Sequence, residues 1–214
     1  MYAETVPPLD FFAKASRMLA DSFLEATVKT AVELALPVLG TWCMVDVIDS
    51  DGSIRRSVII HPNANQQKQA QSYYFSHPPA PGDLFGAGRM ATSKDSLYVE
   101  SDVLGRISGR EHRDLLDNLG AQSLLVIVMR PAGQMLGALT FGSEQRREYD
   151  VADRVLAEDL GNRCATLVES ARNYGENQIT RLRAEHAFAM ENAARTERAY
   201  AAGRGAIHAY RLGH

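Results

Sequence analysis

The chain has 214 residues, a mass of 23.5 kDa, a formal net charge of −3 and a pI of about 6.1. Acidic and basic residues are interspersed, which indicates neither a nucleic-acid-binding surface nor attraction to an anionic membrane. No stretch approaches the ~18 consecutive apolar residues of a membrane-spanning helix, and no secretory signal pattern is present at the start. We therefore expect a cytoplasmic protein, with either one sizeable domain and an appendage or two small domains.

Two amphipathic helices are predicted at the beginning of the chain, after a tail of residues 1–8. Apolar residues recur at helical spacing over residues 9–20 and again over residues 24–36. Asp10 is a candidate N-cap for the first helix, and Pro37 is expected to end the second.

A β-hairpin and a polar segment are predicted next. The patterns of residues 42–48 and 54–60 are typical of strands, and Asp51-Gly52 between them is a strong turn signal. Residues 61–81 contain several Asn and Gln, three consecutive aromatic residues and a run of prolines. A polar segment of this kind, between regular elements, is where a scaffold often places a lid over a ligand.

Shorter elements are predicted between this segment and the most apolar part of the chain. They are a helix within residues 83–91, a strand over 97–99, a second irregular segment over 101–109 and a helix over 111–119. Gly120 fits the C-cap of the last of these helices.

The most informative stretch is AQSLLVIVMRPAGQMLGALTF, residues 121–141. It predicts an apolar strand over 122–129, a tight Pro/Gly turn and a second apolar strand over 135–141. Because hairpins are combined with strands that are approached through helices, we expect an α+β fold with a central antiparallel sheet.

A long amphipathic helix with one wide apolar stripe is predicted over residues 150–174, and Gly175 is expected to interrupt or kink it. Beyond this glycine, weakly apolar positions recur at alternating three- and four-residue spacings. For residues 175–202 this spacing favours a solvated linker helix and a coiled coil about equally. Residues 203–214 are expected to form a flexible tail.

Two segments resemble the GAF domain, a sensor module of many bacterial signalling proteins: LLDNLGAQSLLVIVMRPAGQMLGALTFG and REYDVADRVLAEDLGNRCATLVESARNY. The matching motifs are the strand that follows Leu119-Gly120, the Leu136-Gly137-Ala138-Leu139 strand, and the helix introduced by Tyr149 and Asp153. The family's usual Pro-Leu at the end of the first strand is replaced here by Met129-Arg130-Pro131. The resemblance covers about residues 9–174.

This resemblance implies an antiparallel sheet of about six strands, with the N- and C-terminal helices on one face. Loops and short helices would cover the other face, where a ligand pocket would lie. The resemblance also implies a homodimer formed through the terminal helices, and a signal passed by the C-terminal helix to an output protein.

Candidate ligand-binding residues are found in the predicted strands and in the segments over the pocket. The three consecutive aromatic residues could stack on a planar ligand, or they could pack onto the sheet from a helix, and both possibilities remain open. Alternation along the strands does not tell which face lines a pocket, because both faces are apolar. The candidates are Trp42, Met44, Tyr73, Tyr74, Phe75, His77, Met90, Tyr98, His112, Ser123 and Leu125.

The sequence contains no catalytic motif, and no His or Cys spacing typical of a metal site. His77 and His112 are the credible axial ligands if haem were bound. Cys43 and Cys164 fall in apolar surroundings, which argues against bilin attachment and against sulfoxide reduction.

We therefore expect a non-enzymatic sensory domain, without a cofactor, that binds a small ligand, dimerises, or does both. Two alternatives belong to other classes. One is an enzyme or cofactor-bearing sensor that uses the pocket, resembling a methionine sulfoxide reductase or a haem or bilin protein. The other is a purely structural dimerisation module.

Overall fold

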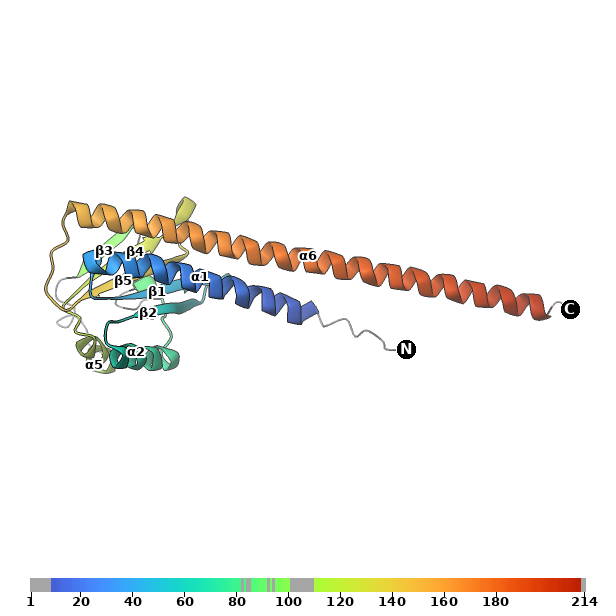
Figure 1. The fold of residues 1–214 in the computed structure, drawn as a ribbon, viewed down its shortest axis with the longest axis horizontal. Coiled ribbons are helices and arrows are strands. Elements are labelled where there is room, and N and C mark those ends of the chain that lie inside the picture. Colours follow the sequence, from blue (N-terminus) through green and yellow to red (C-terminus); the bar gives the residue numbers. More distant parts are fainter. Residues whose placement is uncertain are drawn as a thin grey trace. The chain divides into compact units, whose positions relative to one another are not determined.

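The computed structural model describes residues 9–81, 83, 86–91, 93, 95–100 and 110–212; within these ranges, the side chains of residues 9–13, 17, 111–112, 132 and 201–212 are not described (Figure 1). The chain divides into two compact units. We call Ser22–Ala171 the sheet unit, and Met1–Asp21 with Arg172–His214 the helical unit. No helix in the described part of the chain is long and apolar enough to cross a membrane.

The sheet unit is built on a five-stranded sheet in the order β2-β1-β5-β4-β3, in which all neighbouring strands are antiparallel. This confirms the predicted α+β class with a central antiparallel sheet. A 3₁₀ turn, η1 (Pro131–Gly133), connects the two most apolar strands. The strands are β1 (Trp42–Ile48), β2 (Ile54–Ile60), β3 (Leu97–Glu100), β4 (Ser123–Met129) and β5 (Gly137–Ser143).

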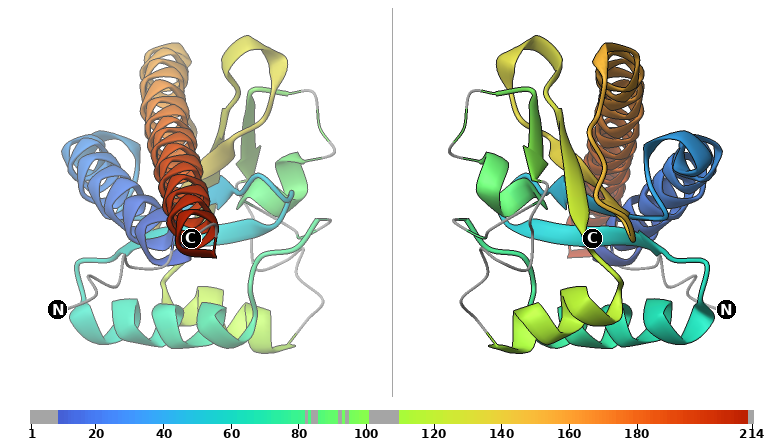
Figure 2. Two further views of the ribbon diagram at one scale, coloured as in Figure 1. Left: turned by 90° about the vertical axis from the view of Figure 1, so that its right-hand side faces the viewer. Right: turned by 90° about the vertical axis from the view of Figure 1, so that its left-hand side faces the viewer.

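Helices cover both faces of this sheet (Figure 2). On one face, which we call the terminal-helix face, lie the parts of α1 (Leu9–Leu39) and α6 (Val151–Leu212) that belong to the sheet unit. The opposite face, which we call the short-helix face, is covered by α2 (Ala64–Ser76), α3 (Gly86–Met90) and α5 (Arg110–Asn118).

Two separate hydrophobic cores result, one on each face. Successive side chains of a strand point to opposite faces, so Cys43 and Val45 of β1 enter the terminal-helix core while Trp42 and Met44 enter the other. All seven residues of β4 are buried, because both of its faces are covered. A strand covered on both faces is apolar throughout, as this one is.

The two helices predicted at the beginning of the chain form one continuous helix, α1. No glycine or proline separates the two predicted segments, and Pro37 lies inside the last turn of α1 rather than ending it. The predicted lid segment also contains a helix, α2, which Asn63 caps by accepting a hydrogen bond from the backbone N–H of Asn65 at 2.9 Å. Capping by a side-chain oxygen supplies the start signal for a segment with little amphipathic pattern.

Helix α6 continues through Gly175 and through most of the segment expected to be a flexible tail, to Leu212. Ion pairs one helical turn apart, Arg181 with Glu185 and Arg195 with Glu191, support its solvated part. Within the helical unit, a Cβ placed on Gly175 would lie 4.0 Å from the Cβ of Ala20, so α1 and α6 are in contact there.

Two glycines of α6 provide a matched test of how this helix packs. A Cβ on Gly161 would lie 2.6 Å from Ile127 Cγ2 of β4, whereas a Cβ on Gly175 would make only an ordinary contact. We expect Gly161→Ala to lower the free energy of unfolding by about 1–3 kcal/mol through overpacking. Gly175→Ala should raise it by about 0.5–1 kcal/mol, because alanine favours the helix. Urea denaturation of both variants measures this, and equal effects would contradict the packing of α6 on β4.

Candidate functional site

The structure brings together part of the predicted site on the short-helix face. Of the candidates, the core of that face includes Trp42, Met44, Tyr73, Tyr74, Met90 and Tyr98. Their side chains pack against one another and against Leu116, Leu124 and Val126, so much of this face is filled by the protein itself.

The remaining candidates lie elsewhere. The assignment of Ser123 and Leu125 is corrected: Leu125 is fully buried in the terminal-helix core, and Ser123 lies two residues before it on the same side of β4. Phe75 and His77 are exposed at the end of α2, and the side chain of His112 lies outside the described residues. Because both faces of β4 are apolar, the sequence could not place these strand residues on one face.

A buried ion pair between β1 and β2, which the sequence analysis missed, lies on the short-helix face. Arg56 donates from Nε to Asp46 Oδ1 at 2.6 Å and from Nη2 to Oδ2 at 2.9 Å. The two side chains are 5% and 1% exposed. Burial lowers the pKa of Arg56, but Asp46 and Tyr74 raise it by more, so the guanidinium stays protonated. A signal did exist: Asp46 is the only charged residue in the strand sequence WCMVDVI.

A β-bulge determines the face of the sheet to which the Arg56 side chain points. Asp46 pairs with Arg56 and Val45 with Val58, which leaves Ser57 as an extra residue in β2. An extra residue reverses the alternation of side chains that follows it. Ile54 and Arg56 therefore face the short helices, whereas Val58 belongs to the terminal-helix core.

The same carboxylate holds α3 against the sheet. Asp46 Oδ2 accepts a hydrogen bond from the backbone N–H of Ala87 at 3.0 Å. Gly86 has a φ of 68°, and a Cβ on it would lie 2.5 Å from Asp46 Oδ2. Both the left-handed backbone and the close approach require glycine at this position.

Tyr74 connects the ion pair to α2. The guanidinium carbon of Arg56 lies 3.7 Å from the centre of the Tyr74 ring, which is the geometry of a cation–π contact. Burial raises the pKa of Tyr74 to about 12, although Arg56 lowers it. Tyr73 packs edge-on against Tyr74 and stacks on His77 with ring centres 4.5 Å apart.

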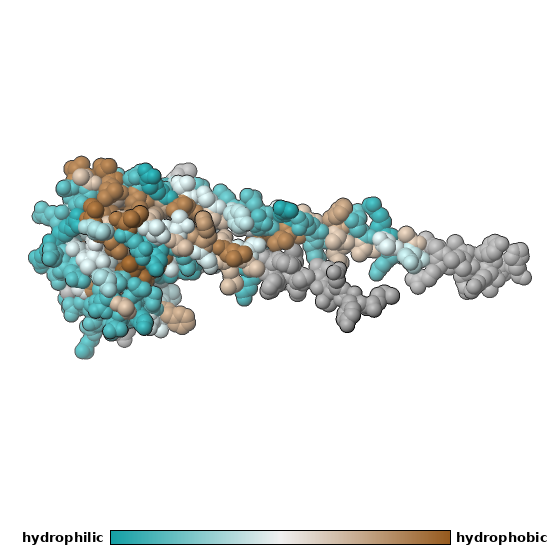
Figure 3. Space-filling view, viewed as in Figure 1, coloured by the Kyte–Doolittle hydropathy of each residue, from teal (hydrophilic) through white to brown (hydrophobic). Residues whose placement is uncertain are grey.

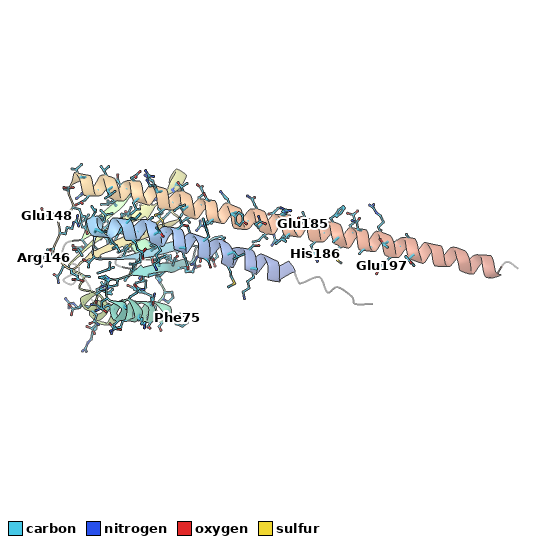
Figure 4. All side chains as sticks on the ribbon, viewed as in Figure 1. Phe75, Arg146, Glu148, Glu185, His186 and Glu197 are labelled. Atoms are coloured by element: carbon cyan, nitrogen blue, oxygen red, sulfur yellow. The ribbon has the colours of Figure 1, made fainter. Side chains whose placement is uncertain are left out.

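An open cleft lies beside this network, between β2 and the end of α2. Its volume is about 340 Å³. The predicted candidates Tyr74 and Phe75 line it, and Phe75, labelled in Figure 4, is 92% exposed. We call it the β2–α2 cleft; its lining residues are Ile54, Arg55, Arg56, Ser57, Ile59, Gln71, Tyr74, Phe75, Pro78 and Pro79.

A second polar cluster fixes the other side of α3. Tyr98 donates from its hydroxyl to Glu100 Oε2 at 2.7 Å, and the guanidinium carbon of Arg89 lies 3.9 Å from the centre of the Tyr98 ring. Helix α3 is thus held to β1 by Asp46 and to β3 by Arg89.

The cysteines are buried away from the cleft, in the terminal-helix core. Burial and the proximity of Cys164 raise the pKa of Cys43 well above its usual value, and burial raises that of Cys164 to about 11. Such thiols are poor nucleophiles. Among the described residues, no group of three or more His, Cys, Asp or Glu side chains could hold a metal ion.

Two adjacent arginines test the buried ion pair. Arg56→Met would leave the Asp46 carboxylate buried without its partner, and we expect a loss of about 3–5 kcal/mol in the free energy of unfolding. Arg55→Met removes a partly exposed ion-pair network and should cost less than about 1 kcal/mol. Urea denaturation compares the two. Similar losses for both variants would contradict a special role for Arg56.

The comparisons with known proteins agree with this fold. The GAF domain model matches residues 23–168. No curated protein matches the chain.

Solved structures with the same fold have low sequence identity. A domain of a protein described as a two-component sensor histidine kinase from Sinorhizobium meliloti 1021 is 12% identical, with a TM-score of 0.54; the match covers 72% of this chain and 96% of that one. The GAF domain region of a protein described as a membrane protein from Geobacter sulfurreducens PCA is 16% identical, with a TM-score of 0.54; the match covers 71% of this chain and 97% of that one. The type II free methionine-R-sulfoxide reductase from Thermoplasma acidophilum is 16% identical, with a TM-score of 0.50, and the match covers 72% of this chain and 95% of that one.

At these identities the solved structures indicate the fold alone. The family model, by contrast, spans well over half of the 214 residues. The chain therefore belongs to the GAF domain family.

Proposed function

We propose that this chain is a non-enzymatic sensory domain of a signalling protein. A small ligand binds in the β2–α2 cleft, two copies associate through the terminal helices, and α6 transmits the signal to an output protein. The observation that carries the proposal is the buried Asp46–Arg56 pair, because it joins the cleft to β1, α2 and α3 at once. Family membership and the solved sensor kinase domain with the same fold support the sensory role.

The bulge at Ser57 supports a path from the cleft to α6. Ser57 lines the cleft, and the next residue, Val58, packs in the core beneath α1 and α6. A change in the cleft that shifts this bulge would therefore also move Val58 in the core on the opposite face of the sheet. Gly161 keeps α6 in close contact with β4 on that face.

A non-enzymatic role is supported by the placement of the nucleophiles. Cys43 and Cys164 are fully buried on the terminal-helix face, and their raised pKa values keep them as thiols. Neither lines the cleft. A sulfoxide reductase needs accessible, ionisable thiols over its pocket.

Dimerisation is supported by a second, exposed stripe on α1, which we call the α1 stripe: Phe23, Thr27, Thr30, Leu34 and Val38. Its members recur at three- and four-residue spacings and carry no charge, as expected for a helix-pairing seam. The two threonine hydroxyls donate to backbone carbonyls of their own helix. Phe23 is 70% and Leu34 78% exposed.

Further apolar side chains extend this surface onto α6. Val151 and Val155 are exposed at the beginning of that helix. Hydrophobic side chains gather over α1 and the first turns of α6 in the sheet unit (Figure 3). Contiguous exposed apolar surface of this kind typically marks an interface, and its uncharged stripe suits a second copy of the same chain.

Leu34→Glu tests the dimer. A charge in the middle of the α1 stripe should raise the dimer dissociation constant at least about tenfold, since it would be buried without a partner. Lys29→Glu, on an exposed part of the same helix outside the stripe, is the matched control and should leave the dimer intact. Sedimentation velocity gives both constants. A monomeric wild-type chain, or equal effects of the two substitutions, would refute this interface.

Ligand sensing is tested by hydrogen–deuterium exchange on the full chain in the presence of a library of small metabolites. We expect at least one compound to protect the amides of β2 and α2 and to change exchange in residues 151–171 of α6 in the same experiment. Protection of the cleft with no change in α6 would contradict transmission. If no compound protected the cleft, the sensory proposal itself would fail.

A further inference from the structure

The charges around the β2–α2 cleft restrict what it can bind. Both arginines that line it are already paired with carboxylates. Arg56 binds Asp46 through two hydrogen bonds, and Arg55 lies 3.1 Å from Glu25 Oε1 and 3.5 Å from Asp49 Oδ2. Three carboxylates therefore face two guanidinium groups, and the surroundings of the cleft carry no excess of positive charge.

An anionic ligand would have to compete with these carboxylates. To bind Arg56 in place of Asp46, it would leave a carboxylate that is 1% exposed without its counter-charge. It would also disturb the hydrogen bond by which Asp46 holds Ala87 of α3. Stranding a buried charge in this way is strongly unfavourable, so the arrangement selects against anions.

The rest of the lining suits a flat apolar molecule. Ile54 and Ile59 of β2 form one side, and Phe75, Pro78 and Pro79 provide ring surfaces at the end of α2. Among the described residues, Phe75 has the most exposed of the large hydrophobic side chains, at 92% (Figure 4). An exposed aromatic ring beside a cleft offers a surface on which a second ring can stack.

We propose that the ligand of the β2–α2 cleft is an uncharged, planar aromatic molecule of about two fused rings. Its rings lie against Phe75 and the two prolines, and the Gln71 amide supplies a neutral polar contact for one hydroxyl or carbonyl group. A volume of about 340 Å³ is at the small end of ligand sites, which limits the size of the molecule. This inference rests on the proposed sensory function and names the ligand class of the same site.

Two probes with the same ring system test whether a negative charge weakens binding. They are 2-naphthol, which is neutral at pH 7, and 2-naphthoate, which is an anion of similar shape. Each is titrated into the full-length ¹⁵N-labelled chain, and amide chemical shifts are recorded. We expect saturable shifts for 2-naphthol in residues 54–59 and 71–77. The dissociation constant of 2-naphthoate should be at least about tenfold higher, a difference that corresponds to the free energy of one modest contact.

Two variants with the same substitution show where the ring binds. Phe75→Ala should weaken 2-naphthol binding about fivefold or more. Phe188→Ala removes a phenyl ring that is also exposed, at 67%, but lies on α6 outside the cleft, and it should leave the affinity unchanged. Both side chains are exposed, so neither variant is expected to disturb folding.

Each other outcome has a distinct meaning. Equal or tighter binding of 2-naphthoate in the same residues would overturn the ligand class and leave ligand sensing in place. Shifts outside the cleft, or no binding of 2-naphthol, would overturn the inference, while the metabolite library would still test the sensory function. Shifts in these amides that depend on protein concentration without a probe would place a second copy of the chain on the cleft and would also overturn it.

Discussion

The buried pair of Asp46 and Arg56 is the constraint on which the short-helix face depends. Two opposite charges in a dry interior are tolerated only when their hydrogen bonds are made, and here the carboxylate meets the guanidinium and the backbone of α3 together. The guanidinium also supports the ring of Tyr74 on α2. A single interaction between neighbouring strands thereby fixes both α2 and α3, the two helices that follow β2 in the chain.

Different kinds of contact hold the helices on the two faces of the sheet. On the terminal-helix face, small residues such as Gly161, Cys164 and Ala165 let α6 approach the sheet closely. On the short-helix face, charged and aromatic contacts hold short elements that bury little apolar surface of their own. Short elements held by a few polar contacts are easier to displace locally than a long helix packed over many turns. We therefore expect local opening to be easier on the short-helix face, beside the cleft, than under α6.

Strand positions could be predicted from the sequence because apolar runs and turn signals are local, and the five strands lie close to where these signals put them. The site could not, for a physical reason that Leu125 and Arg56 illustrate. Leu125 belongs to a strand that is apolar on both faces, so alternation carries no information about direction. Arg56 faces Asp46 only because of the bulge at Ser57, and a bulge depends on pairing between strands. A helix in the segment of α2 remained one of two open possibilities, because a cap, rather than an amphipathic pattern, starts it.

The transmission that we propose requires two alternative packings of α1 and α6 on the sheet, and it is limited by how differently a ligand binds them. A molecule that rests on Phe75 alone would bind both packings equally and shift nothing, because that ring is exposed and free of the core. A molecule that also contacts Ser57 or Tyr74 touches residues whose positions are tied to Val58 and to the Asp46–Arg56 pair. We therefore expect contact with the exposed Phe75 ring to determine mainly how tightly the ligand binds. Contact with Ser57 or Tyr74, on the inner wall of the cleft, should determine mainly how strongly binding changes the packing of α6.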